Sequence, residues 1–118
     1  MEILAVGRNP ALLTQLCVCL SKLFPDAEVR REMDALLAGK YVFNHRIDLL
    51  IAEAGTKLMN GVQLCQFARR EQPDVCTCVI GTEEELHSLT PAKEVDHTLE
   101  FPCTVDSLRI ALLDRSSR

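Results

Sequence analysis

The stretch IDLLIAEAGTKLMNG, Ile47 to Gly61, decides how this chain folds. Its first part is an apolar run, which is typical of a buried strand in a parallel sheet covered on both faces. The run ends at the carboxylate of Glu53, and Gly61 closes the loop that follows. Because open parallel sheets bind ligands at the carboxyl ends of their strands, Glu53 is a candidate functional group.

Strands and helices alternate along the rest of the chain. Asn9 and Asp34 are placed to cap helices, and Thr82 with Glu85 forms the pattern of a capping box. The expected strands lie at 2–6, 47–52 and 95–101, with two more that each follow a turn within 25–31 and 73–81. The expected helices lie at 10–24, 35–43, 62–72, 82–89 and from 104 onward. This order predicts an α/β fold with a parallel sheet and helices on both of its faces.

The bulk composition favours one small globular domain over residues 1–118. A 47% hydrophobic content is enough to form a core, and the sequence has no apolar run long enough to span a membrane. No signal peptide is recognisable at the N-terminus, so we expect a cytoplasmic protein with no membrane contact. The net charge of −4 and the scattered arginines argue against nucleic-acid binding.

Six cysteines are present, and their setting favours packing over chemistry. The pairs have C-x-C spacing with no histidine beside them, which is not the pattern of a metal site. Nothing in the sequence points to an oxidising compartment, so disulfides are not expected either. We therefore expect small apolar side chains and no metal or other cofactor.

The whole pattern resembles the receiver domain of bacterial two-component response regulators. In that family a phosphorylatable aspartate ends the third strand and a glycine follows eight residues later, the spacing of Glu53 and Gly61. Pro10 and Pro102 also fall where receivers often have prolines, the second of them across a cis bond. The resemblance implies a flavodoxin-like, five-stranded parallel sheet with the strand order 2-1-3-4-5.

The chemistry of that family needs five groups, and each is replaced in this chain. Two acids that hold Mg²⁺, the phosphoacceptor aspartate, a hydroxyl on the fourth strand and a lysine on the fifth are expected. Their places are taken by Gly7 and Arg8, Glu53, Ile80, and Phe101. Mg²⁺ takes oxygen ligands and phosphoryl transfer needs charge neutralisation, so these substitutions imply loss of the reaction.

The resemblance therefore implies a pseudo-receiver: a regulatory domain, not an enzyme, that acts through protein–protein contact. Two alternatives stay open. Glu53 can be weakly phosphorylated, or can mimic phosphorylation, in a phosphorelay; or the emptied pocket can bind a small ligand. For Glu53 itself we expect a solvated carboxylate, in a direct or water-bridged ion pair with the side chain of Arg8.

The last helix supplies a candidate partner surface. Val105, Leu108, Ala111 and Leu112 form the face expected to dock on the sheet, which leaves Ile110 and Leu113 exposed. Arg109 and Asp114 are expected to form the charged rim of this face. Receivers commonly pair or signal through their last helix, so we expect a protein partner or a homodimer at Arg109, Ile110, Leu113 and Asp114.

Overall fold

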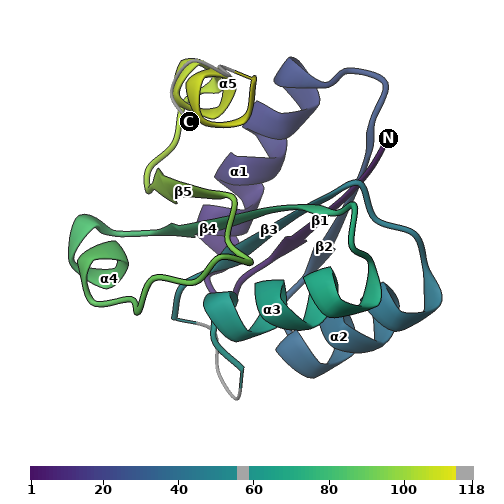
Figure 1. Ribbon diagram of the computed structural model, residues 1–118. Helices are drawn as coiled ribbons and strands as arrows, with labels where there is room; N and C mark the ends of the chain where they lie inside the picture. The colour runs from purple at the N-terminus through teal and green to yellow at the C-terminus, as the bar shows by residue number, and fades with distance from the viewer. Residues whose placement is uncertain (56–58, 114–118) are drawn as a thin grey trace.

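The computed structural model describes residues 1–55 and 59–113. Its elements alternate in the expected order (Figure 1). They are β1 (Glu2–Val6), α1 (Pro10–Leu23), β2 (Glu28–Glu32), α2 (Ala35–Asn44), β3 (Leu49–Glu53), α3 (Gly61–Glu71), β4 (Cys76–Gly81), α4 (Glu83–His87), β5 (His97–Glu100) and α5 (Val105–Leu113). None of the described helices is long and apolar enough to cross a membrane.

The five strands form one parallel sheet in the order β2-β1-β3-β4-β5, which confirms the flavodoxin-like topology. In the register, Val6 stands beside Ala52 and Glu53 beside Ile80. The carboxyl ends of β1, β3 and β4 therefore meet at one edge, where the candidate site was expected.

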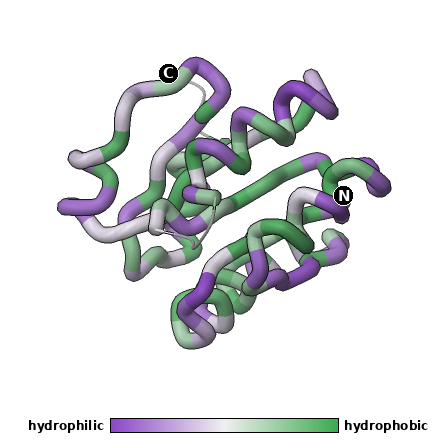
Figure 2. The backbone as a smooth tube through the Cα atoms, turned by 90° about the horizontal axis from the view of Figure 1, so that it is seen from below, coloured by the Kyte–Doolittle hydropathy of each residue, from purple (hydrophilic) through white to green (hydrophobic). Residues whose placement is uncertain are grey.

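Two hydrophobic clusters lie on the two faces of the sheet. α1 and α5 cover one face, and α2 and α3 cover the other (Figure 1). Alternate residues of β3 serve the two sides, as strand geometry requires: Leu49 and Ile51 belong to the first cluster, and Leu50 and Ala52 to the second. Figure 2 shows the hydrophobic strands crossing the middle of the fold.

The helix starts follow the capping residues of the sequence. The Asn9 side chain accepts bonds from the N–H groups of Ala11 and Leu12, and Asp34 caps α2 in the same way. Thr82 and Glu85 form the expected reciprocal capping box. Asn60 and Gln63 form a second box, which places the start of α3 at Gly61, one residue before the expected start.

α4 is shorter than the sequence suggested. It ends at His87, well before Pro91. The Ser88 hydroxyl donates to the carbonyl oxygen of Glu85 at 2.8 Å. A local bond of this kind competes with continued helix, so α4 stops after little more than one turn.

Candidate functional site

The predicted pocket is assembled at the carboxyl edge of the sheet. Gly7 and Arg8 follow β1, and Glu53 is the last residue of β3. β1 and β3 are neighbours in the sheet, so the strand order brings Arg8 and Glu53 together as expected.

Glu53 is buried, contrary to the expectation of a solvated acid. Only 7% of its surface is exposed, and Oε2 accepts a hydrogen bond of 2.8 Å from the backbone N–H of Arg8. The reason is Gly7: a Cβ added there would stand 2.8 Å from Oε2 of Glu53 and 3.3 Å from its Cβ. The missing side chain at position 7 leaves the room that the longer glutamate occupies.

The direct form of the expected ion pair is not found: in the part of the chain that the structure describes, Arg8 and Glu53 are joined through the backbone N–H of Arg8. Among the described residues, ion pairs within 4.0 Å join Arg46 to Asp48, Arg69 to Asp96 and Arg109 to Asp106. The Arg8 side chain extends toward Gly55 instead, with Nη2 3.9 Å from the place of a Gly55 Cβ. Oε2 of Glu85 lies 2.9 Å from the same place, so the side chains of Arg8 and Glu85 both lie beside Gly55.

Among the described residues at the carboxyl end of β4, none places a free hydroxyl beside Glu53. Ile80 stands beside Glu53 in the ladder, but its side chain is fully buried in the first hydrophobic cluster. The next residue, Gly81, ends the strand with no side chain at all. The hydroxyl of Thr82 accepts from the N–H of Glu85 at 3.2 Å and so serves as the cap of α4.

Phe101 directly follows β5 at the carboxyl edge of the sheet. Its backbone N–H donates to the carbonyl oxygen of Gly81 at 2.8 Å, and its half-buried ring packs against the first hydrophobic cluster. The Phe101–Pro102 peptide bond is cis, as the resemblance implied for Pro102. An aromatic ring here supplies no cation to a phosphoryl group.

The site thus combines the buried carboxylate of Glu53 with the backbone N–H of Arg8, and the side chains of Arg8 and Glu85 lie beside Gly55. Within residues 1–55 and 59–113, no three His, Cys, Asp or Glu side chains cluster as a metal site would require. Mg²⁺ binds through carboxylate and other oxygen ligands, and the carboxylate present already accepts from Arg8.

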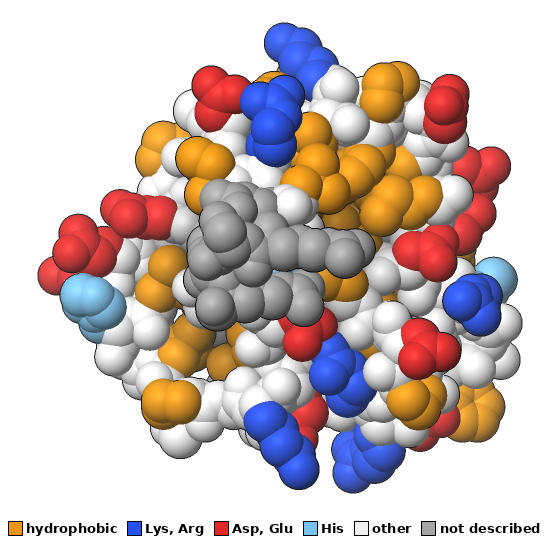
Figure 3. All heavy atoms as spheres, turned by 45° about the horizontal axis from the view of Figure 1, so that its top comes forward, with side chains coloured by type: hydrophobic (Ala, Val, Ile, Leu, Met, Phe, Trp, Pro, Cys, Tyr) orange, Lys and Arg blue, Asp and Glu red, His pale blue; other side chains and the backbone are white. Residues whose placement is uncertain are grey.

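The predicted face of α5 is exposed in its described part. The exposed fractions of Ile110 and Leu113 are 58% and 51%, while Leu108 is fully buried. Arg109 pairs with Asp106, with 2.6 Å between Nη1 and Oδ1, whereas Asp114 lies outside the described residues. α5 packs on α1, and Figure 3 shows apolar side chains gathered on this side of the molecule.

The cysteines are all free thiols, as expected of side chains that pack. Burial raises the pKa of the Cys65 thiol to about 12 and raises the pKa of Cys78 well above its usual range. Reactive thiols have lowered pKa values, so these groups are inert at neutral pH.

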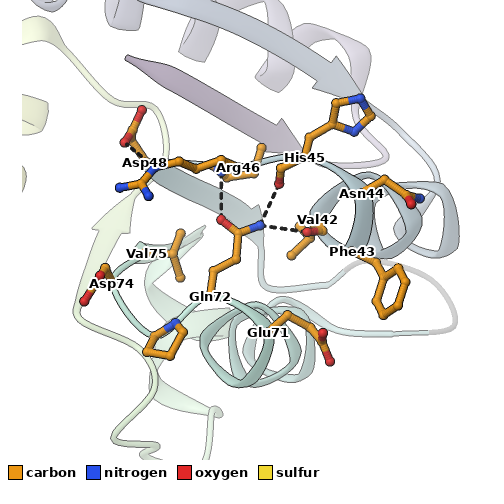
Figure 4. Close-up of a pocket in the computed structure, with 12 residues that line it drawn as sticks. Val42, Phe43, Asn44, His45, Arg46, Asp48, Glu71, Gln72, Asp74 and Val75 are labelled. Carbon is orange, nitrogen blue, oxygen red and sulfur yellow. Dashed lines mark hydrogen bonds and ion pairs between the residues drawn. The ribbon is translucent and has the colours of Figure 1, made fainter.

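A hollow at the opposite edge of the sheet was not anticipated. It measures about 420 Å³ and lies where α2 and α3 end (Figure 4). The Gln72 side chain donates to the carbonyl oxygens of Val42 and His45, each at 2.7 Å, and accepts from the N–H of Ile47 at 2.8 Å. Gln72 thereby fixes the loop that leads into β3. The sequence could not predict these hydrogen bonds, because a polar residue just after a helix gives no indication of which distant backbone groups it will contact.

Comparisons with known proteins place the fold. No family model matches the sequence, and a search of curated proteins finds no relative. Solved structures do resemble it. The signal receiver domain of an HD domain-containing protein from Pseudomonas fluorescens has a TM-score of 0.81 at 22% identity, over 96% of this chain and 84% of that one. The receiver domain of NtrX from Brucella abortus has a TM-score of 0.79 at 18% identity, over 92% of each chain.

A third solved structure is similar in fold. A response regulator from Burkholderia pseudomallei with a phosphorylated aspartic acid and a calcium ion has a TM-score of 0.77 at 19% identity, over 98% of this chain and 68% of that one. The sheet order and the cis bond before Pro102 agree with the resemblance that the sequence implied. This chain has the fold of response regulator receiver domains.

Proposed function

We propose that this chain is a regulatory module of the receiver type that acts through protein–protein contact and does not take up a phosphoryl group. The observation that carries the proposal is the buried carboxylate of Glu53. It fills the space over Gly7 and accepts from the Arg8 N–H at 2.8 Å, on the side where receivers hold their metal ion.

The neighbouring groups support the same reading. A phosphoryl group carries charge that must be neutralised by a metal ion or a cation, and it gains most from donors already aimed at it. Ile80 is buried in the core, Phe101 is aromatic and the Thr82 hydroxyl caps a helix. A small ligand in the emptied pocket also loses support, because the Glu53 side chain fills the space above Gly7.

The test is phosphorylation in vitro. The protein is incubated with acetyl phosphate and Mg²⁺ and its intact mass is measured, while a phosphorylatable receiver is treated in parallel as the positive control. We expect no mass increment in this protein. In a second arm, beryllofluoride and Mg²⁺ are titrated against the amide spectrum, where we expect no saturable shift at Arg8 or Glu53. A phosphorylated species, or such a shift, contradicts the proposal.

The output surface that we propose is α5. Ile110 and Leu113 form an apolar centre that the core does not use, and Arg109 with its partner Asp106 borders it. An apolar centre with a polar rim is the usual anatomy of an interface. A two-fold homodimer is the simplest assembly, because it uses one patch twice.

Sedimentation velocity tests the surface. The variant with Ile110→Glu and Leu113→Glu should keep its circular dichroism spectrum and lose self-association or partner binding. Leu37→Glu is the matched control, since Leu37 is 49% exposed on a different helix. If the double variant associates like the parent protein, the interface lies elsewhere; if it unfolds, the two residues belong to the core.

A further inference from the structure

An apolar groove runs between α2 and α3, on the face of the sheet that α5 does not cover. It measures about 400 Å³, and Leu36 and Phe43 line it from α2. Their exposed fractions are 52% and 68%. The other wall is made by Met59 and Phe67, which pack against the second hydrophobic cluster.

The residues of α2 that face the groove follow one helical stripe. Leu36, Gly39, Lys40 and Phe43 are spaced i, i+3, i+4 and i+7, the spacing at which helical side chains share a face. The core does not need this stripe, because α2 docks through Ala38 and Val42 on its other side. Two large apolar side chains are thus left in water along one line.

Gly39 leaves the middle of the stripe without a side chain, between Leu36 and Phe43. A Cβ there would touch nothing more closely than an edge atom of the Phe67 ring, at the ordinary van der Waals distance of 3.8 Å, so the glycine leaves a shallow place between the two apolar side chains of α2. A partner backbone can approach α2 closely at this point, between the two apolar anchors. Amphipathic helices bind grooves of this kind through anchors at the same spacing.

The charge of the groove selects among occupants. Of its described lining residues, only Lys40 carries a charge. In a two-fold pairing of α2 with itself, centred on Gly39, the two Lys40 ammonium groups would approach each other and repel. A partner helix with acidic residues beside its apolar stripe meets Lys40 with the opposite sign.

We propose that the α2–α3 groove binds an amphipathic helix of a partner protein, with apolar residues seated between Leu36, Phe43 and Phe67 and an acidic residue against Lys40. This surface is separate from α5 and does not depend on it. It adds a second binding site to the regulatory module.

The probe is a fluorescein-labelled peptide of about five helical turns, with leucines on one stripe and glutamates beside it. A second peptide has lysines in place of the glutamates, and a third has the first composition in scrambled order. Fluorescence anisotropy measures binding, and the amide spectrum locates it. We expect saturable binding of the acidic peptide, shifts at Leu36, Lys40 and Phe67, and no binding of the scrambled peptide.

Variants distinguish specific binding of the peptide in the groove from non-specific hydrophobic binding. Leu36→Glu should weaken binding by about tenfold or more, as loss of a central anchor does. Leu37→Glu, on the same helix with a similar exposed fraction, should leave binding unchanged. Lys40→Glu should reverse the preference between the acidic and the basic peptide. The variant with Ile110→Glu and Leu113→Glu should bind normally, whatever happens to self-association.

Three results would overturn the proposal. One is the absence of saturable binding by the acidic peptide. Another is equal loss in the Leu36 and Leu37 variants when circular dichroism shows both folded. The third is a concentration-dependent dimer that Leu36→Glu dissolves, since that result assigns the groove to a second copy of this chain.

Discussion

The close approach of Gly7 and Glu53 gives a quantitative prediction. Gly7→Ala places a methyl group 2.8 Å from Oε2 of Glu53 and 3.3 Å from its Cβ. Either the loop after β1 moves or the carboxylate leaves the Arg8 N–H. Overpacking costs about 1–3 kcal/mol, and a lost hydrogen bond to a charged group costs about 1.5–3 kcal/mol. The protein takes the cheaper route, so we expect a loss of about 2 kcal/mol.

The same substitution should cost much less once the glutamate carboxylate is gone. In the Glu53→Ala background the 2.8 Å contact with Oε2 is lost, and only the 3.3 Å approach to the Cβ at position 53 remains. Gly7 does not have a positive φ, so its backbone accepts an alanine without strain. In the Glu53→Ala background, Gly7→Ala should change the free energy of unfolding by less than about 1 kcal/mol, of either sign, because the alanine also restricts the unfolded chain.

A double-mutant cycle measures the difference. Urea unfolding of the parent, the two single variants and the double variant is followed by circular dichroism, with equal m-values as the check that only stability changes. We expect a coupling of about 2 kcal/mol between the two positions. If Gly7→Ala costs the same in both backgrounds, the side chain of Glu53 does not occupy the space over Gly7, and the reasoning fails with it.

Three further predictions concern stability. Gly61→Ala should destabilise by about 3 kcal/mol or more, since its Cβ would meet the Glu53 carbonyl oxygen at 2.7 Å. The control is Gly39→Ala on α2, whose Cβ would make only an ordinary contact of 3.8 Å with the Phe67 ring; it should stabilise by about 0.5–1 kcal/mol, and urea unfolding of both variants checks the opposite signs. Gln72→Ala should cost about 2–4 kcal/mol in the same assay, because it removes three hydrogen bonds between the end of α3 and the loop before β3. Finally, burial raises the pKa of the Cys65 thiol to about 12 in the folded protein, whereas an unfolded thiol has a pKa of ~8.5. The free energy of unfolding should therefore decline as the pH rises above ~8.5, because only the unfolded chain then releases the proton. A Cys65→Ala variant should show a shallower decline between about pH 8 and pH 10, and an unchanged slope would contradict the assignment.

Much of the fold could be predicted because local signals and the global pattern agree. The caps at Asn9, Asp34 and Thr82 mark helix starts directly, and the apolar run before Glu53 marks the central strand. The exposed positions of α5 were predictable for the same reason, since helical periodicity fixes which side chains face the sheet. The end of α4 was not, because it depends on one hydroxyl bond at Ser88.

The positions of Arg8 and Glu53 at one edge of the sheet were predictable, but the contacts between them were not. Strand order brings Arg8 beside Glu53, and that order follows from the resemblance. Whether a glutamate at a strand end points into water or back over the neighbouring loop depends on the space at Gly7, which is a three-dimensional fact. The α2 stripe was not predicted from the sequence, since it is the position of Phe67 on α3 that makes Leu36 and Phe43 part of a groove.

The buried Glu53 carboxylate and the two proposed binding surfaces bear on how a signal would pass through this domain. A signal shifts a conformational equilibrium only by binding one state better than another. The Glu53 carboxylate is part of the chain and is always present, so under the proposed function no phosphoryl signal enters at that edge. Under the same proposal, input and output both come from proteins bound at the two proposed surfaces. α5 packs on the first hydrophobic cluster, and the α2–α3 groove lies over the second, on opposite faces of the sheet. Partners at the two proposed surfaces would therefore not compete for one face, and coupling between them would pass through the sheet, whose central strand ends at Glu53.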